Sequence, residues 1–333
     1  MSQGYGCWNE WSGEELPLSL VERALRKLQA SRAASEASGG VGDAASRMEP
    51  VIDRTEPARP VSSPPRVGRI RLGTAKPVEL DIEALRASGV LPPRSEERQL
   101  ADQYRTIKRP LIKYAFEPEE RARPEAASRR SIIVTSALPG DGKTFTAVNL
   151  ALSLSREQDH SVVLVDADVA KRDVTHLLGM GDKAGLLDVL ADRARAIESV
   201  IAPTNIPGLS VLSAGSVSSA ATELLASARM REVMASLTAL DPQCLFVLDS
   251  PPILLTTEAP VLVSLFGQVL VVVKAGETPQ HALLAALRII GRTSHVNLVL
   301  NWADTVGPTG YPGGSQYGYG YHDSGTEADT TNE

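Results

Sequence analysis

The second half of the chain alternates short apolar runs with helical patterns. Between Ser131 and Trp302, six apolar segments are near-continuous rather than alternating, which is typical of strands buried on both faces of a parallel sheet. Segments with apolar positions three and four apart separate them, as expected of covering helices. We therefore predict one α/β domain over residues 131–302, with a mainly parallel sheet covered by helices on both faces. The predicted strands are Ile132–Thr135, Val162–Asp166, Leu209–Leu212, Cys244–Asp249, Val269–Val273 and Leu298–Leu300.

Residues 1–92 show a different pattern. Apolar residues recur on one helical face from Leu18 to Leu28, which predicts an amphipathic helix that either docks on a partner or on the domain, or is a plain surface helix. From Ser31 to about Lys76 the chain is rich in Ala, Ser, Gly and Pro. Such a segment buries too little apolar surface to offset its ordering entropy, so we predict a disordered linker. A short helix over Asp81–Ala87 follows.

Two further segments flank the predicted domain. Residues 93–130 form a helical lead-in, in which Ser95–Tyr114 carries mixed charge and Pro110 is expected to break or kink the helix. Residues 303–333 form a tail with four tyrosines among nine Gly and Pro residues, a composition that favours an extended, flexible chain. The four tyrosines are Tyr311, Tyr317, Tyr319 and Tyr321.

Charge and composition narrow the possible functions. The chain has 34 basic and 40 acidic side chains and a net charge of −6, which argues against a general nucleic-acid binder. Five of the acids and none of the bases lie in the tail, so 35 acids against 34 bases leave −1 for the rest. Two cysteines and five scattered histidines do not have the spacing of a zinc site.

The chain also lacks the usual marks of a membrane or secreted protein. The most apolar uncharged stretch, Ala259–Val273, contains Pro260 and Gly267 and is shorter than the about 20 residues of a spanning helix. The N-terminal residues lack the basic start and apolar run of a secretory signal. We therefore expect a cytoplasmic protein.

The clearest motif directly follows the first predicted strand. Residues 135–144 read TSALPGDGKT and precede a helical segment. A glycine-rich turn between strand and helix presents backbone N–H groups to a polyphosphate, while the lysine and threonine contact the β/γ-phosphates and Mg²⁺. Ala137 replaces the first glycine of GxxxxGK[ST], and the motif still predicts a P-loop NTPase. The predicted nucleotide-binding residues are Gly140, Asp141, Gly142, Lys143, Thr144 and Phe145.

Two other predicted strands end in carboxylates. Asp166 and Asp168 end the second strand, and Asp249 ends the strand that begins at Cys244. Because ligands bind beyond the carboxyl ends of parallel strands, these acids are expected to converge on the Mg²⁺ of a nucleotide. Asn301, at the end of the last predicted strand, is a candidate for contact with adenine or, equally, a structural cap.

These motifs carry a family resemblance. With SALPGDGKTFTAVNLA, VVLVDADVAK, CLFVLDSPP, QLADQYRTIKRPL, GLLDVLAD and VNLVLN, the chain resembles the bacterial tyrosine kinases of polysaccharide export, especially the exosortase-associated tyrosine autokinases. The resemblance implies ATP and Mg²⁺ as cofactors and phosphorylation in trans of the four tail tyrosines. It also implies catalytic roles for Lys143, Asp166 and Asp168, and metal ligation by Thr144, Asp166 and Asp249.

The resemblance also implies partners. Besides other copies of itself, the chain is expected to act with a separate membrane protein that controls polysaccharide chain length and activates it. A tyrosine phosphatase is a further expected partner, and the chain is expected to lie peripherally at the inner membrane. Exopolysaccharide biosynthesis and export would then be the regulated process.

Two positions depart from the family pattern. The second motif of many such kinases is DxDxR, but Ala170 stands at the arginine position and Lys171 follows it, so Lys171 is a candidate for the missing positive charge. The ExxRxx[RK] subunit-contact motif is replaced by a segment in which Asp102, Arg105 and Lys108 fill the charged positions. Their spacing permits an intermolecular ion-pair strip or a plain solvated helix face.

The main alternative is a non-kinase P-loop ATPase that acts as a switch or scaffold, as in plasmid partition and division-site positioning. Those ATPases carry a second lysine at the position of Leu138, which favours the kinase. The tail is open to a second interpretation as well, namely a low-complexity segment with no chemistry.

Overall fold

The computed structural model describes residues 73–117, 128–181, 183–291 and 295–303, all of which lie in one compact unit, Pro65–Glu333. The predicted amphipathic helix, most of the predicted linker and the four tail tyrosines lie outside the described residues, so those predictions stay open. The strands are β1 (Ser131–Ser136), β2 (Ser161–Asp166), β3 (Ala202–Pro203), β4 (Leu209–Leu212), β5 (Cys244–Asp249), β6 (Gln268–Lys274) and β7 (His295–Asn301).

Helices precede the first strand and fill most connections between strands. They are α2 (Ile82–Ala87), α3 (Glu97–Phe116), α4 (Lys143–Ser155), α5 (Asp173–Leu177), α6 (Leu186–Ala191), α7 (Ala221–Leu225), α8 (Ala228–Leu240), α9 (Glu258–Val263) and α10 (Gln280–Ile290), with 3₁₀ turns η2 (Ser128–Arg130) and η3 (Ile197–Ser199).

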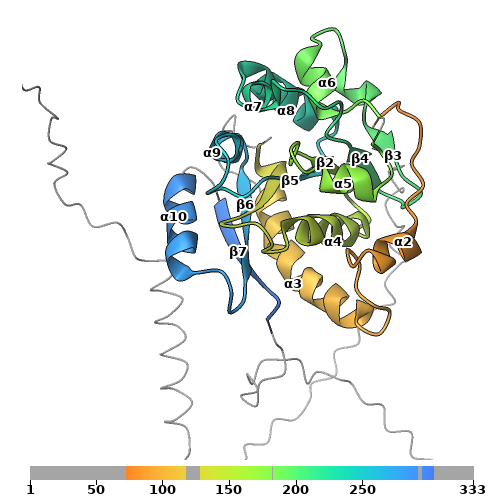
Figure 1. Ribbon diagram of the computed structural model, residues 1–333. Coiled ribbons are helices and arrows are strands. Elements are labelled where there is room, and N and C mark those ends of the chain that lie inside the picture. The colour runs from red at the N-terminus through yellow and green to blue at the C-terminus, as the bar shows by residue number, and fades with distance from the viewer. Residues whose placement is uncertain (1–72, 118–127, 182, 292–294, 304–333) are drawn as a thin grey trace, which may run out of the picture. The chain divides into compact units, whose positions relative to one another are not determined.

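The strands form a single sheet in the order β3-β4-β2-β5-β1-β6-β7 (Figure 1). Every strand pair is parallel except β3 with β4. The prediction of a mainly parallel sheet is confirmed, and its six predicted strands are present. The two-residue strand β3 was not predicted, because its pairing depends on the neighbouring strand rather than on a local apolar run.

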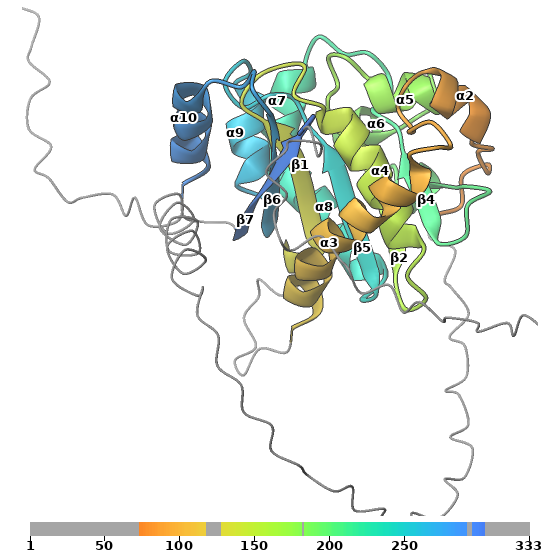
Figure 2. The same cartoon turned by 90° about the horizontal axis from the view of Figure 1, so that it is seen from below.

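Helices cover both faces of the sheet (Figure 2). On one face, α6, α8, α9 and α10 pack on strand residues such as Phe246 and Val271. On the other, α2, α3, α4 and α5 pack on strand residues such as Ile132 and Val247. Alternate residues of β1 and β5 face opposite cores, which explains why every position of these two strands is buried.

The segment before the first strand is part of the second core. Val78, Leu80, Leu85 and Leu91 are buried there. The side chain of Asn205 accepts a hydrogen bond from the backbone N–H of Leu80 at 3.0 Å and donates one to its carbonyl at 3.2 Å. Residues 73–92, of which 73–76 were predicted to end the linker, therefore belong to the folded unit. The predicted short helix is confirmed as α2.

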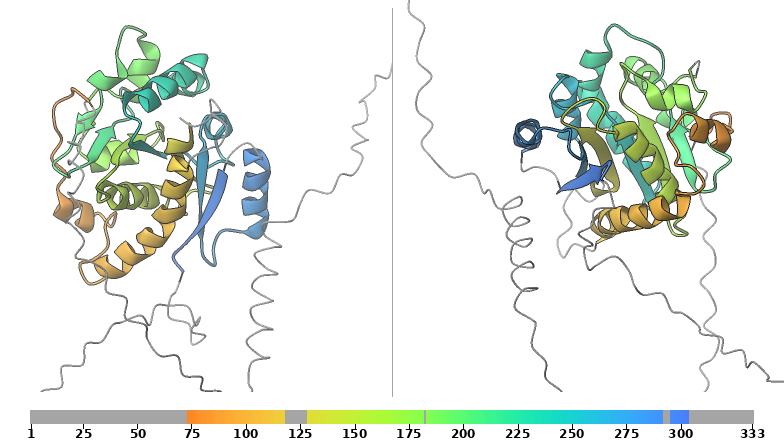
Figure 3. Two further views of the ribbon diagram at one scale, coloured as in Figure 1. Left: turned by 180° about the vertical axis from the view of Figure 1, so that it is seen from behind. Right: turned by 60° about the horizontal axis from the view of Figure 1, so that its bottom comes forward.

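Helix α3 lies alongside α4 and runs without a break past Pro110 (Figure 3). The predicted break at Pro110 is therefore wrong. Tyr104, Leu111 and Ala115 are buried on both sides of the proline, so packing holds the helix together. Gln268 also donates a hydrogen bond to the carbonyl of Leu111 at 3.1 Å.

Candidate active site

The glycine-rich turn lies between the end of β1 and the first turn of α4. Gly140 and Gly142 have φ values of +85° and +95°, a region that favours glycine. A Cβ atom at Gly142 would lie 2.1 Å from the side-chain nitrogen of Asn301. Glycine is therefore required at position 142 by both backbone conformation and space, and the turn can present its N–H groups at the start of α4.

Asp141 holds this turn from within. One of its carboxylate oxygens accepts from the backbone N–H of Leu138 at 3.2 Å, and the other accepts from the hydroxyl of Thr278 at 2.8 Å. The side chain of Asn301 donates to the Asp141 carbonyl at 3.0 Å. The Asp141 side chain is thus a brace of the turn, and only its backbone is left to contact a nucleotide.

Asn301 has a structural role in this arrangement. Its bond to the turn matches the structural alternative given in the sequence analysis, and a contact with adenine stays a prediction. Trp302 follows with a φ of +58°, and the Lys274 ammonium lies 5.3 Å from its ring centroid.

Lys143 and Thr144 begin α4 beside the buried end of β5. The Thr144 hydroxyl donates to one carboxylate oxygen of Asp249 at 2.7 Å, and the other oxygen of Asp249 is buried without a hydrogen-bond partner. Burial raises the pKa of Asp249 to about 8, and the nearby Lys143 charge lowers it only in part. Asp249 is a strongly desolvated carboxyl group that a cation would stabilise.

Asp166 is the direct neighbour of Asp249, because the two residues pair in register at the ends of β2 and β5. One of its carboxylate oxygens accepts from both the backbone N–H and the hydroxyl of Thr175, at 2.8 and 2.7 Å, while the other is buried without a partner. Burial raises the pKa of Asp166 to about 6. Thr175 therefore fixes the orientation of this carboxylate.

Asp168 completes the group of three acids. It is buried, and burial raises its pKa, while the charges of Lys143 and Lys171 oppose that rise. The backbone N–H of Lys171 donates to the Asp168 carboxylate at 3.3 Å. Arg172 instead donates to the carbonyls of Gly181 and Gly215, so Lys171 is the exposed cation beside the acids.

The structure thus brings together the predicted Lys143, Thr144, Asp166, Asp168 and Asp249. Their arrangement suits the binding of a metal–polyphosphate group. In the described part of the chain, no three His, Cys, Asp or Glu side chains form a metal site by themselves. A cation would need the unpaired carboxylate oxygens and the Thr144 hydroxyl together with ligand oxygens, and the two orphaned oxygens fit that requirement.

The predicted subunit-contact residues are only partly exposed. Asp102 and Arg105 pair with each other at 2.6 Å on the surface of α3. Lys108 points inward, where its ammonium donates to the Ser153 carbonyl at 2.8 Å and pairs with Glu157 at 2.6 Å. Of the three charged positions, two are therefore exposed, because Lys108 packs against α4, and the choice between an intermolecular ion-pair strip and a solvated helix face stays open.

Sequence reasoning missed the residues that hold this site together. Thr175 orients Asp166, Thr278 braces Asp141, and Asn149 donates to the carbonyls of Phe145 and Val90 at 2.8 and 2.7 Å. None of these polar residues forms a motif with its partner, since the contacts depend on tertiary structure.

Comparison with known proteins agrees with this geometry. A ParA family profile, described as NUBPL iron-transfer P-loop NTPase, matches residues 127–280. The crystal structure of the VpsO kinase domain aligns over 64% of this chain and all of that domain, with a TM-score of 0.52 and 24% identity. The chimerical protein CapA2B2 aligns over 69% of this chain and 92% of its own, with a TM-score of 0.51 and 22% identity. These two likenesses establish the fold.

Curated relatives carry kinase names. The tyrosine-protein kinase YwqD of Bacillus subtilis is 32% identical over 178 residues, which cover 54% of this chain and 70% of YwqD. The putative tyrosine-protein kinase EpsB of Ralstonia nicotianae is 32% identical over 192 residues, 57% of this chain and 24% of EpsB. The tyrosine-protein kinase wzc of Salmonella typhimurium is 34% identical over 148 residues, 44% of this chain and 20% of the relative.

The matched region spans 24% of EpsB and 20% of wzc, but 70% of YwqD. The ParA profile match, residues 127–280, includes the turn and the three strand-end acids. On this evidence the chain belongs to the family of bacterial tyrosine-protein kinases.

Proposed function

We propose that the protein is an ATP-dependent protein-tyrosine kinase that phosphorylates its own C-terminal tyrosines in trans. The observation that carries this proposal is the group of three buried carboxylates, Asp166, Asp168 and Asp249, beside the P-loop Lys143 and Thr144. Phosphoryl transfer needs positioning and charge neutralisation more than covalent chemistry by the protein. This group of residues supplies both.

The residues fall into two roles. Lys143 offsets negative charge on the β- and γ-phosphates, and Thr144 with Asp249 and Asp166 would hold Mg²⁺. When bound, that cation supplies positive charge against the charge that develops on the transferred group. The buried, unpartnered oxygens of Asp249 and Asp166 support this assignment.

The acceptor hydroxyl must lose a proton during transfer. Tyrosine in water has a pKa of about 10, so a nearby acceptor for the proton is needed. Either Asp166 or Asp168 takes this role. Thr175 holds Asp166 in one orientation, whereas Asp168 lies next to the exposed Lys171. Separate Asp166→Asn and Asp168→Asn variants test which of the two carboxylates accepts the proton.

The proposed setting extends the resemblance to the tyrosine kinases of polysaccharide export. Four tyrosines in a Gly- and Pro-rich tail (residues 303–333) are suitable acceptors. We further propose regulation of exopolysaccharide biosynthesis and export, a membrane chain-length protein as activator, and a phosphatase that reverses the modification. In this arrangement the protein acts at the cytoplasmic side of the inner membrane through its partner. No helix in the described ranges has the length and apolar character needed to cross a membrane.

One observation favours a second candidate. The ParA profile covers most of the domain, and a nucleotide-dependent switch or scaffold would use the same P-loop. Leu138 occupies the position where those ATPases carry a second lysine, which supports the kinase instead.

The two candidates are separated by an assay on the purified full-length chain. With ATP and Mg²⁺, the wild type should gain phosphotyrosine, and Lys143→Met should reduce the signal by roughly a hundredfold or more. The matched control is Lys113→Met, which removes an exposed lysine of α3 that pairs only weakly with Glu117 at 4.0 Å. Absence of phosphotyrosine on the wild type, even with the activating partner, would favour the switch.

A further inference from the structure

One edge of the sheet ends in an uncovered strand. β7 is the last strand in the sheet order, and β6 is its neighbour on one side (Figure 1). The described residues place no strand on its other side. Four of the seven exposed large apolar side chains in the described part of the chain lie here, namely Ile289 of α10, Leu298 and Leu300 of β7, and the next residue, Trp302. Solvent-facing apolar groups therefore gather at this edge.

The free edge also offers backbone hydrogen-bonding groups. The N–H of His295 donates to the carbonyl of Gly267, just before β6, at 3.1 Å. Backbone directions alternate along a strand, so the odd-numbered residues of β7 face β6. Val296, Leu298 and Leu300 therefore direct their N–H and C=O groups outward. An edge of this kind is a template for another strand.

The strand carries none of the usual protection against edge pairing. Sheet edges are commonly protected by lysine, proline or an inward-pointing charge, whereas residues 295–301 read HVNLVLN. The ring of His295 stacks on Tyr114 at 4.1 Å, and burial with the nearby charge of Arg129 lowers its pKa. The strand is thus uncharged at neutral pH, and an edge with these properties is expected to pair with a further strand.

The chain's own tail is a poor strand for this edge. It begins at residue 303, directly after β7. Residues 303–333 contain Pro308 and Pro312, seven glycines, and five acids without a base. A segment that turned back along β7 would place its prolines, which cannot donate to a ladder, against the free edge, and glycine further weakens a strand. The strand that completes the edge is therefore better supplied by another chain.

A second copy of β7 fits the edge, because the strand is complementary to itself. An antiparallel pair related by a two-fold axis through Leu298, the middle residue, brings all residues of β7 into register. Leu298 then faces its counterpart, and Val296 faces Leu300 of the other copy. His295 faces Asn301, so no like charges meet. Apolar side chains meet apolar ones, and the outward backbone groups of both strands are paired.

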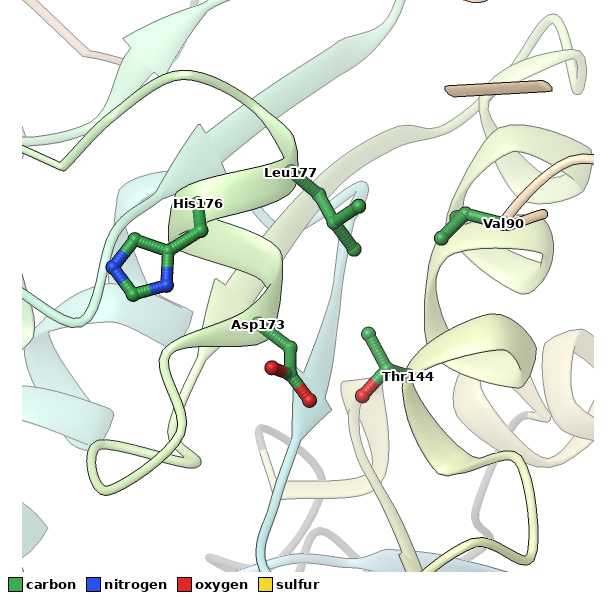
Figure 4. Close-up of a pocket in the computed structure, with 5 residues that line it drawn as sticks. All are labelled: Val90, Thr144, Asp173, His176 and Leu177. Atoms are coloured by element: carbon green, nitrogen blue, oxygen red, sulfur yellow. The ribbon is translucent and has the colours of Figure 1, made fainter. Parts of the chain in front are cut away.

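This edge lies apart from the acids of the proposed active site. Those acids lie at the ends of β2 and β5, and β1 and β6 stand between β5 and β7. The pocket of about 500 Å³ next to Thr144 is lined from α4, α5 and the turn after α2 (Figure 4). Pairing through β7 therefore does not involve the residues that line that pocket.

We propose that the free edge of β7 is a self-association surface, on which two copies of the chain pair their β7 strands antiparallel and continue the sheet across a two-fold axis. Leu298 and Leu300 of both copies then lie on the same face of the joined sheet and cover one another. This inference goes beyond the proposed kinase function, since the pairing needs neither a nucleotide nor a tyrosine.

The first test measures mass in solution. Light scattering after size-exclusion chromatography is applied to the nucleotide-free full-length chain, whose single-copy mass is 35.5 kDa. Leu298→Lys and Leu300→Lys add a charge to the edge, and Val217→Lys is the matched control because Val217 is 80% exposed and outside β7. The wild type and the control should have at least twice the single-copy mass. Each edge variant should lose roughly twofold in mass at equal concentration, with circular dichroism as the check of folding.

The second test reports the register of the pair. Two cysteines introduced by Leu298→Cys would face each other with Cα atoms about 5.5 Å apart, within reach of a disulfide. Mild oxidation of this full-length variant should give a covalent dimer on a non-reducing gel, and the control Val217→Cys should give far less. Cys244 is buried, and Cys7 is replaced by serine in both variants.

Three results would overturn the inference. A wild type of single-copy mass at every concentration would leave the edge to the tail or to another protein. Unchanged mass in both lysine variants would place self-association elsewhere on the surface. Absence of a covalent dimer from Leu298→Cys would exclude the proposed register. None of these measurements involves ATP, so failure of the proposed kinase function, seen as absence of phosphotyrosine, is a separate outcome.

Discussion

At the scale of single residues, the site concentrates carboxyl groups where water is excluded. Asp166 and Asp249 are fully buried and adjacent, and Asp168 is nearly so. Burial raises the pKa of each. Such groups weaken the folded state of the free protein, and the cation of the proposed function would offset that cost on binding.

The burial of Asp249 predicts an unusual pH dependence of stability for the protein free of metal and nucleotide. Folded Asp249 keeps its proton up to about pH 8, whereas in the unfolded chain an aspartate ionises near pH 4. Between these values the folded state binds more protons, so its stability falls as pH rises, by up to about 1.4 kcal/mol per pH unit. Chemical denaturation of the EDTA-treated protein between pH 5 and about 8 measures this slope.

Asp249→Asn should flatten this slope and abolish phosphoryl transfer. The exposed Glu223→Gln is the control and should keep both the slope and the activity. A slope in Asp249→Asn equal to that of the wild type would show that Asp249 is already ionised in the free folded protein.

At the scale of elements, much of the fold follows from the sequence. Strands β1, β2 and β5 each contain an uninterrupted apolar run, Ile132–Val134, Val162–Val165 and Cys244–Leu248, so their burial between two helical layers could be predicted. The acids at the ends of β2 and β5 could be assigned to one edge of the sheet for the same reason. The register that makes Asp166 and Asp249 direct neighbours could not, because strand order depends on contacts distant in sequence.

The polar contacts between elements were beyond sequence reasoning. The inward direction of Lys108 depends on a carbonyl of α4 and on Glu157. The attachment of the segment around α2 depends on Asn205, which is 125 residues away from Leu80. A helix with mixed charge does not reveal which of its charges find partners inside the protein, and a single Asn does not reveal its distant partner.

The attachment of the segment around α2 gives a second prediction. Asn205→Ala removes two hydrogen bonds to the Leu80 backbone, each with a net contribution of about 0.5–1.5 kcal/mol. We expect the free energy of unfolding to fall by roughly 1–3 kcal/mol and the amides of residues 78–91 to exchange faster with solvent. Hydrogen exchange followed by mass spectrometry measures the local effect.

Asn205→Asp is the matched control for this prediction. It keeps an oxygen that accepts from the Leu80 N–H but sets a carboxylate oxygen against the Leu80 carbonyl in place of the donated bond, so protection of residues 78–91 should fall in this variant as well. Equal protection of residues 78–91 in the wild type and in Asn205→Ala would mean that apolar burial alone, through Leu85 and Leu91, holds the segment.

At the scale of the whole molecule, the net charge of −6 is chiefly a property of the tail. Five acids and no bases lie in residues 303–333, against −1 for the remaining chain. Each phosphate on a tyrosine adds about −1.5 to −2. If copies associate by presenting their tails to neighbouring sites, the added charge should weaken that association by repulsion.

This argument predicts that the phosphorylated protein has a lower mass in solution than the unphosphorylated one. Light scattering after size-exclusion chromatography compares the two forms at equal concentration. A variant with all four tail tyrosines replaced by phenylalanine should show no change of mass after treatment with ATP and Mg²⁺. An equal mass for both forms of the wild type would contradict the repulsion argument.

The central claim is transfer of phosphate from the active site of one copy to the tail of another. The most direct measurement mixes Lys143→Met carrying an intact tail with an active copy whose Tyr311, Tyr317, Tyr319 and Tyr321 are replaced by phenylalanine, and maps phosphotyrosine by mass spectrometry. The account predicts phosphate on the tail of the Lys143→Met copy. The contradicting result is phosphotyrosine on the wild type incubated by itself but none on the Lys143→Met copy in the mixture.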